Sequence, residues 1–123
     1  MFIMIDILQN WIENIKSNDA NKVADLYHRK GLLLGTFSNI ERRGQNLILD
    51  YFNNLLKSQV DVEIITKHEY RSESIATASG LYNFILNDKK VKARFSFVFL
   101  KTKKKWEILS HHSSVLPEKT KSA

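Results

Sequence analysis

The chain has 123 residues, of which 43% are apolar and 11% aromatic, and these values are typical of one globular domain with a hydrophobic core. It contains no cysteine, which excludes disulfides, thiolate chemistry and cysteine-based zinc sites. The net charge of +6 comes mainly from predicted turns and the C-terminus, and the aromatic residues follow core spacing, so the pattern predicts a solvated surface rather than a nucleic-acid interface.

The first half of the chain is predicted to be mainly helical. Apolar residues recur at helical spacing in three segments: Ile5, Leu8, Ile12 and Ile15; then Val23, Ala24, Leu26 and Tyr27 after the capping residue Asp19; then Ile48, Tyr51, Phe52 and Leu55. Before the third helix, a short apolar strand at Leu32–Leu34 ends at Gly35. Arg42 and Arg43 are predicted to form a turn or a brief strand.

The second half of the chain is predicted to be strands. The predicted strands are Val60–Ile64, Ile75–Leu86, Val91–Leu100 and Trp106–Ser114. The only proline, Pro117, follows the last of them. Helices followed by a meander of strands predict an α+β fold, with the helices on one face of an antiparallel sheet. We predict a single domain over residues 1–118 and a flexible basic C-terminal tail over 119–123.

The N-terminal segment Met1–Ile5 is apolar, but Asp6 interrupts it and no basic residue precedes it. This pattern predicts neither a signal peptide nor a membrane span. We therefore expect a cytoplasmic protein without a membrane partner.

The last predicted strand combines apolar and polar side chains. Regular alternation places Trp106, Ile108, His112 and Ser114 on one face. A histidine and a hydroxyl beyond a Trp/Ile pair predict the polar end of an apolar pocket. His111 and Ser113 then fall on the opposite face, and a β-bulge in the strand would exchange the two sets.

This order of elements resembles the cone-shaped domain of the NTF2-like superfamily, and within it the subgroup related to the association domain of calcium/calmodulin-dependent protein kinase II. The shared features are the turn Ser17–Ala20, the helix motif Tyr51-Phe52-x-x-Leu55-Leu56 and the strand Trp106…His112-x-Ser114. The resemblance implies an NTF2-like, cystatin-like cone in which N-terminal helices pack on a curved sheet and enclose a pocket.

A narrower pattern resembles the iota-class carbonic anhydrases. It comprises Leu33–Asn39, Arg42, Ile48-x-x-Tyr51-Phe52, Ala93–Val98 and His111-His112-Ser113-Ser114-x-Leu116-Pro117-Glu118. The chain departs from the family pattern at Gly35, where a larger residue is expected, and at Arg43, where a threonine is common. The resemblance implies interconversion of carbon dioxide and bicarbonate in a hydroxyl-lined pocket, without a metal or other cofactor.

The resemblance also implies the site residues. Thr36, Tyr51 and Ser114 would donate hydrogen bonds to the bicarbonate oxygens, and His112 would act as the base or orient Ser114. A metal site has little support, because His28 and His68 stand alone and the two neighbouring histidines of the last strand diverge.

The alternative hypothesis is a non-catalytic association domain for oligomerisation or small-molecule binding. Phe95, Phe97 and Phe99 alternate with Val98 and Leu100, so the third long strand carries two apolar faces. Helices cover only one of them, and a second copy of the chain is expected on the other. The resemblance places His111 and Ser113 in this interface, and we predict a homodimer.

Overall fold

The computed structural model describes residues 5–103 and 105–118. Helices α1 (Ile5–Lys16), α2 (Ala20–Asp25) and α3 (Gln45–Leu55) pack beside a six-stranded sheet. The strands are β1 (Tyr27–Leu34), β2 (Arg42–Arg43), β3 (Val60–Arg71), β4 (Ile75–Leu86), β5 (Lys89–Lys101) and β6 (Trp106–Val115). The predicted α+β layout is confirmed, while the tail 119–123 lies outside the described residues.

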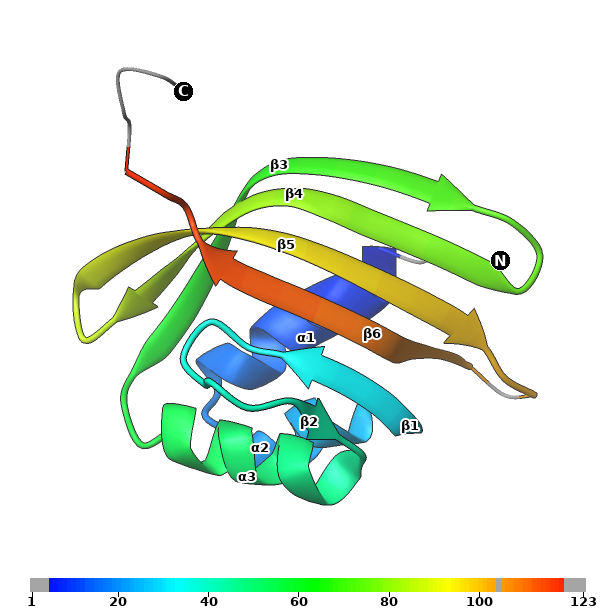
Figure 1. Cartoon of the computed structure of the whole chain (residues 1–123), viewed down its shortest axis with the longest axis horizontal. Coiled ribbons are helices and arrows are strands. Elements are labelled where there is room, and N and C mark those ends of the chain that lie inside the picture. Colours follow the sequence, from blue (N-terminus) through cyan, green and yellow to red (C-terminus); the bar gives the residue numbers. More distant parts are fainter. Residues whose placement is uncertain (1–4, 104, 119–123) are drawn as a thin grey trace.

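The sheet is mixed rather than purely antiparallel. Its strand order is β2-β1-β6-β5-β4-β3, and β1 runs parallel to β6 while the other neighbours are antiparallel. The first long strand therefore lies beside the last one (Figure 1). Tyr27, predicted within the second helix, instead begins β1 and pairs with Ile108. The helix α2 has only six residues and β1 follows it almost directly. An apolar residue at the start of the strand therefore continues the helical spacing of the short helix, and the sequence alone does not separate the two elements.

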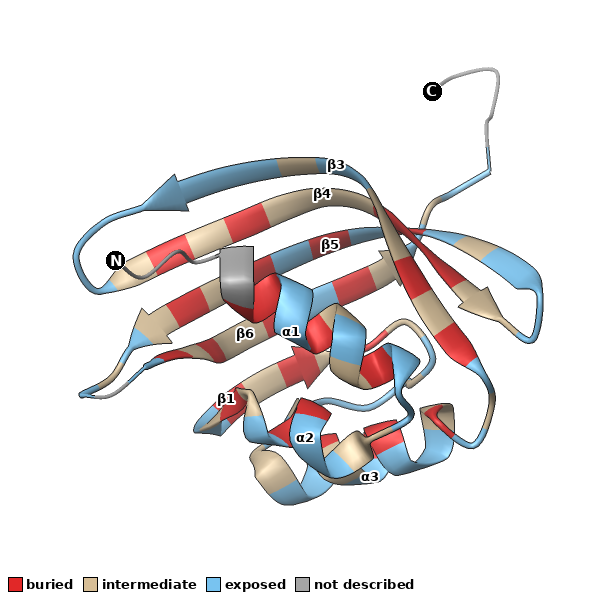
Figure 2. Ribbon diagram, turned by 180° about the vertical axis from the view of Figure 1, so that it is seen from behind, coloured by how far each residue is buried: buried red, intermediate tan, exposed pale blue. Residues whose placement is uncertain are grey.

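Helix α1 lies across one face of the sheet, with α2 and α3 beside it (Figure 2). Its buried side chains recur at helical spacing on the side of the sheet, and they are Ile7, Leu8, Trp11 and Ile15. The Trp11 ring meets the Phe97 ring edge-on at 5.4 Å between centroids. The core thus forms between this helix and the face of β5 that carries the alternating phenylalanines.

A β-bulge interrupts the pairing of β5 with β6. Ile108 is opposite Phe99 and Ser110 is opposite the next residue, Val98, so Leu109 is an extra residue on β6. Each residue of β6 after Leu109 therefore faces the side opposite to that predicted from regular alternation. Among the described residues, no helix is long and apolar enough to cross a membrane.

Candidate functional site

The bulge places the polar end of β6 differently from the sequence prediction. Trp106, Ile108, His111 and Ser113 are buried on the helix-covered face, whereas His112 is exposed on the other face. The prediction that His112 and Ser114 share the face of Trp106 and Ile108 is wrong, and so is the prediction that His111 and Ser113 are interfacial. The physical reason is the single extra residue, Leu109, which reverses the alternation.

Thr36 and Ser113 meet at the end of β1. Because β1 and β6 are parallel and Leu34 pairs with His112, the residues that follow Leu34 reach the same level as Ser113. The Thr36 Oγ1 and Ser113 Oγ atoms are 2.5 Å apart. Ser113 is 4% exposed and Thr36 is half-buried, so this hydroxyl pair lies at the boundary between the core and the surface.

Tyr51 approaches the same turn from α3. The backbone N–H of Phe37 donates to the Tyr51 hydroxyl at 3.4 Å. A Cβ atom added to Gly35 would lie only 2.5–2.7 Å from the Tyr51 ring and hydroxyl. The glycine that departs from the family pattern therefore lets the tyrosine lie against the turn. Tyr51 therefore contacts both chain neighbours of Thr36, and its hydroxyl lies at the turn that carries Thr36.

Burial keeps the tyrosine hydroxyl protonated. Tyr51 is 6% exposed, and burial raises its pKa to about 12, although the Phe37 hydrogen bond and the Arg42 charge act in the opposite direction. At neutral pH it is a neutral hydrogen-bond donor, which suits an oxygen atom that develops negative charge.

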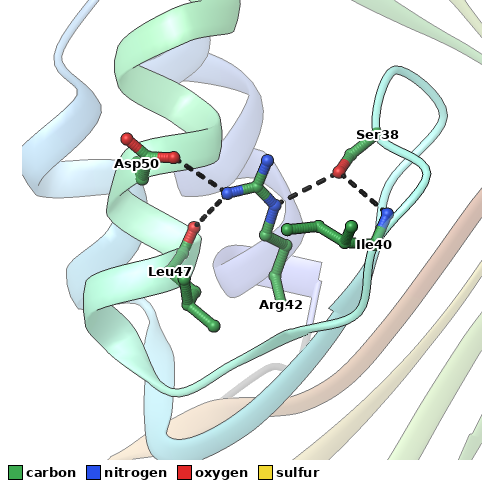
Figure 3. Close-up of polar contacts among 5 residues, drawn as sticks. All are labelled: Ser38, Ile40, Arg42, Leu47 and Asp50. Carbon is green, nitrogen blue, oxygen red and sulfur yellow. Dashed lines mark hydrogen bonds and ion pairs between the residues drawn. The ribbon is translucent and has the colours of Figure 1, made fainter.

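Arg42 brings a fixed positive charge to Tyr51, because its guanidinium carbon lies 5.9 Å from the centre of the Tyr51 ring. Figure 3 shows the contacts that hold the guanidinium in place. Its Nε donates to Ser38 Oγ at 3.2 Å, and one terminal nitrogen pairs with Asp50 Oδ2 at 2.9 Å and the Leu47 carbonyl at 3.5 Å. The side chain is only 13% exposed, so these contacts hold the charge at the site.

Two surface hollows of about 240 Å³ each flank the turn that carries Thr36. The first, here called the Tyr51 hollow, is lined by Phe37, Arg42, Tyr51, Asn54 and Leu55. The second, the Ser113 hollow, is lined by Leu34, Gly35, Ser38, Asn39, Ile40, Glu41, His112 and Ser113. Each is large enough for a small molecule of a few heavy atoms, and together they offer hydroxyls, a cation and an imidazole.

Ser114 lies elsewhere. With His112, Arg94, Phe95 and Ser96 it lines a further hollow of about 240 Å³ on the outer side of the sheet. Of the four residues predicted for the site, the structure therefore brings Thr36 and Tyr51 to one turn. It leaves His112 at the rim and Ser114 outside.

The sequence prediction missed two buried tyrosines, Tyr27 and Tyr82. Both are 0% exposed, and their hydroxyls are hydrogen-bonded to opposite ring nitrogens of His111. A tyrosine at core spacing needs a partner for its hydroxyl, and this requirement was the one available signal for such a network. Within the described residues, no group of three His, Cys, Asp or Glu side chains gathers closely enough to hold a metal ion.

Comparisons with known proteins agree with this architecture. The family model of the calcium/calmodulin dependent protein kinase II association domain matches residues 3–117. A proposed association domain of this kind from Xanthomonas campestris is 35% identical, with a TM-score of 0.87, over 94% of this chain and 86% of that one. No curated protein matches the chain significantly.

More distant solved structures share the fold. An NTF2-like protein of unknown function from Pseudomonas putida is 11% identical, with a TM-score of 0.84, over 97% of this chain and 87% of that one. A proposed dehydratase of the NTF2-like family from Streptomyces avermitilis is 12% identical, with a TM-score of 0.82, over 91% and 92%. The predicted NTF2-like, cystatin-like fold is confirmed, and the chain belongs to the calcium/calmodulin dependent protein kinase II association domain family.

Proposed function

We propose that this protein is a metal-independent carbonic anhydrase that interconverts carbon dioxide and bicarbonate at the turn carrying Thr36. The observation that carries the proposal is that the turn carrying the Thr36 hydroxyl is also the turn that the Tyr51 hydroxyl contacts, with the half-buried cation Arg42 beside Tyr51. The resemblance of the chain to the iota-class enzymes, in the motifs around Thr36, Tyr51 and His111–Glu118, points to the same substrate.

In hydration, a water oxygen forms a bond to the carbon of carbon dioxide, and the electron pair of one C=O bond moves to its oxygen. The Thr36 and Tyr51 hydroxyls donate hydrogen bonds to the oxygens that become negative, and the positive charge of Arg42 favours the anionic product. Ser113 stands behind Thr36 and holds it through their mutual hydrogen bond. The protein thus binds the transition state more strongly than neutral carbon dioxide.

The proton released from water needs an acceptor, because water without a metal has a pKa of about 15.7. His111 is unsuited to this role, since burial and the neighbouring His112 lower its pKa to about 3. His112 lines the Ser113 hollow from its exposed rim, and an imidazole is the side chain best suited to proton transfer near neutral pH. We assign it the transfer of this proton to solvent.

The test is carbon dioxide hydration by the purified protein, measured by stopped flow before and after dialysis against a strong chelator. We expect turnover that the chelator leaves unchanged, with much less than one metal per chain by elemental analysis. Tyr51→Phe should lower turnover about 10²-fold, because it removes one donor to the developing oxyanion and keeps the ring.

Tyr70→Phe is the matched control, because Tyr70 is 69% exposed on β3, and it should match the wild type. Stoichiometric zinc with chelator-sensitive turnover would contradict the metal-free mechanism. Absence of turnover in the wild type would leave the association-type domain as the function.

The family match and the outer face of the sheet favour assembly into a homodimer. Val98 and Leu100 are half-buried on the face opposite to Phe97 and Phe99, as predicted, and the described helices pack on the phenylalanine side (Figure 2). A second copy of the chain on this outer face would cover both apolar side chains.

Sedimentation velocity should show a dimer for the wild type, because the apolar outer face of β5 is then buried. Val98→Lys should shift the protein toward monomer, since a lysine placed in a two-fold interface meets its own copy. Leu47→Lys, at an exposed position of α3 on the helix side of the molecule, should leave the dimer intact. A wild-type monomer at all concentrations would count against this assembly.

A further inference from the structure

Six side chains form one continuous chain of hydrogen bonds from the core to the Thr36 turn. They come from α1, β1, β4 and β6 and from the turn itself, so the chain joins all layers of the fold. In order, they are Trp11, Tyr27, His111, Tyr82, Ser113 and Thr36.

Two donors fix the direction of this chain. The Trp11 indole N–H is a donor only, and it donates to the Tyr27 hydroxyl oxygen at 3.0 Å. Nearer the surface, the Tyr82 hydroxyl donates to Ser113 Oγ at 2.5 Å. A hydroxyl has a single proton, so Tyr82 has none left for its other neighbour, His111.

The protonation of His111 follows from its two neighbours. Nε2 lies 3.2 Å from the Tyr82 oxygen, and only a proton on Nε2 can make this contact a hydrogen bond. Burial lowers the pKa of His111 to about 3, so the ring is neutral and carries one proton. Nδ1 is therefore bare and accepts from the Tyr27 hydroxyl at 2.8 Å.

The direction continues to the surface. Ser113 accepts from Tyr82, so its own proton is available for its other hydroxyl neighbour, the Thr36 Oγ1 atom 2.5 Å away. Thr36 accepts this bond and keeps its own proton. Every donor in the chain thus points from the core toward the half-buried Thr36 hydroxyl, and hydrogen bonds aligned in this way polarise one another.

We infer that His111 is held as the neutral Nε2–H tautomer and, acting through Tyr82 and Ser113, directs the Thr36 hydroxyl proton outward as the donor to a bound oxyanion. His111, Tyr82 and Ser113 are positioning residues, and Thr36 touches the ligand. The inference rests on the proposed function for the identity of the oxyanion, bicarbonate.

The test is long-range ¹H–¹⁵N NMR of the full chain labelled at histidine, combined with bicarbonate binding measured by ¹³C NMR. In the wild type at pH 7 we expect His111 to be protonated at Nε2 and not at Nδ1. Tyr82→Phe removes the acceptor of Nε2–H, so the ring should shift toward the Nδ1–H tautomer. The dissociation constant for bicarbonate should rise about tenfold, because Thr36 loses its orientation.

Tyr27→Phe tests the other end of the chain, since it removes the donor to Nδ1. It too should give a mixture of tautomers and weaker bicarbonate binding, while Tyr70→Phe should change neither. An Nδ1–H or doubly protonated His111 in the wild type would overturn the inference. So would a wild type that binds no bicarbonate, or unchanged bicarbonate binding in both folded core variants.

The bicarbonate arm separates this inference from the proposed enzyme activity. Suppose that the wild type hydrates no carbon dioxide, but that it binds bicarbonate and Tyr82→Phe binds it more weakly. The inference about the hydrogen-bond chain is then supported, and the catalytic proposal is refuted.

Discussion

Ser113→Ala is expected to lower carbon dioxide hydration about 10²-fold, as the loss of an oxyanion donor does in other enzymes. The Ser113 hydroxyl holds Thr36 at 2.5 Å and accepts from Tyr82, so its removal frees Thr36 from the orientation that the core imposes. Ser114→Ala is the matched control. Ser114 is the next residue on the same strand, it faces the outer side of the sheet, and its loss should leave turnover close to that of the wild type.

Stopped-flow hydration at 25 °C, with melting temperatures for both variants, checks this result. Ser113→Ala leaves the buried Tyr82 hydroxyl without its acceptor, and such a loss costs about 1–3 kcal/mol of stability, so folding must be verified. If Ser114→Ala were the damaging change and Ser113→Ala were silent, the site would lie on the outer face of β6 and not on the helix-covered face.

Acid should destabilise the protein through His111. Burial and the neighbouring His112 lower its folded-state pKa from an ordinary 6.5 to about 3. Between these two values the unfolded chain binds a proton that the folded chain does not. The stabilising effect of the neutral ring is therefore complete above pH 6.5 and is lost as the pH falls toward 3. The lost free energy of unfolding is on the order of 5 kcal/mol.

Urea unfolding at a series of pH values measures this loss. His111→Phe, which keeps an aromatic ring against Phe97, should show a much shallower decline between pH 6.5 and pH 3. His112→Gln, at the exposed neighbouring position, should retain most of the wild-type decline. Equal slopes for the wild type and His111→Phe would show that His111 is not the group responsible.

The helices and long strands could be predicted from the sequence because each carries a strong apolar period. The face of the last strand could not, because the bulge at Leu109 leaves no trace in the sequence. Trp106–Ser114 looks like a regular strand, and Leu109 is an ordinary strand residue. Because of this one extra residue, the interior contains His111 and Ser113 instead of the predicted His112 and Ser114.

Thr36 and Tyr51 were predicted for the site by resemblance and lie at the same turn, whereas their catalytic roles stay predictions. Their proximity depends on Gly35, because the Tyr51 ring occupies the space that a side chain at position 35 would need. In the sequence, Gly35 was only a departure from the iota-class pattern, because the sequence does not show that the Tyr51 ring packs against it. The roles of Tyr27 and Tyr82 depend equally on contacts between distant strands, which no local period reveals.

The pairing of β1 with β6 has a consequence for the order of folding. Thr36 and Ser113 are 77 positions apart, and their contact forms only when nearly the whole chain is available. On the ribosome, a nascent chain that has not yet reached Trp106 has no strand to place beside β1. Because such non-local pairing raises contact order, it slows folding. We therefore expect the hydroxyl pair to be among the last native contacts to form, after the β3–β4–β5 meander whose strands are neighbours along the chain.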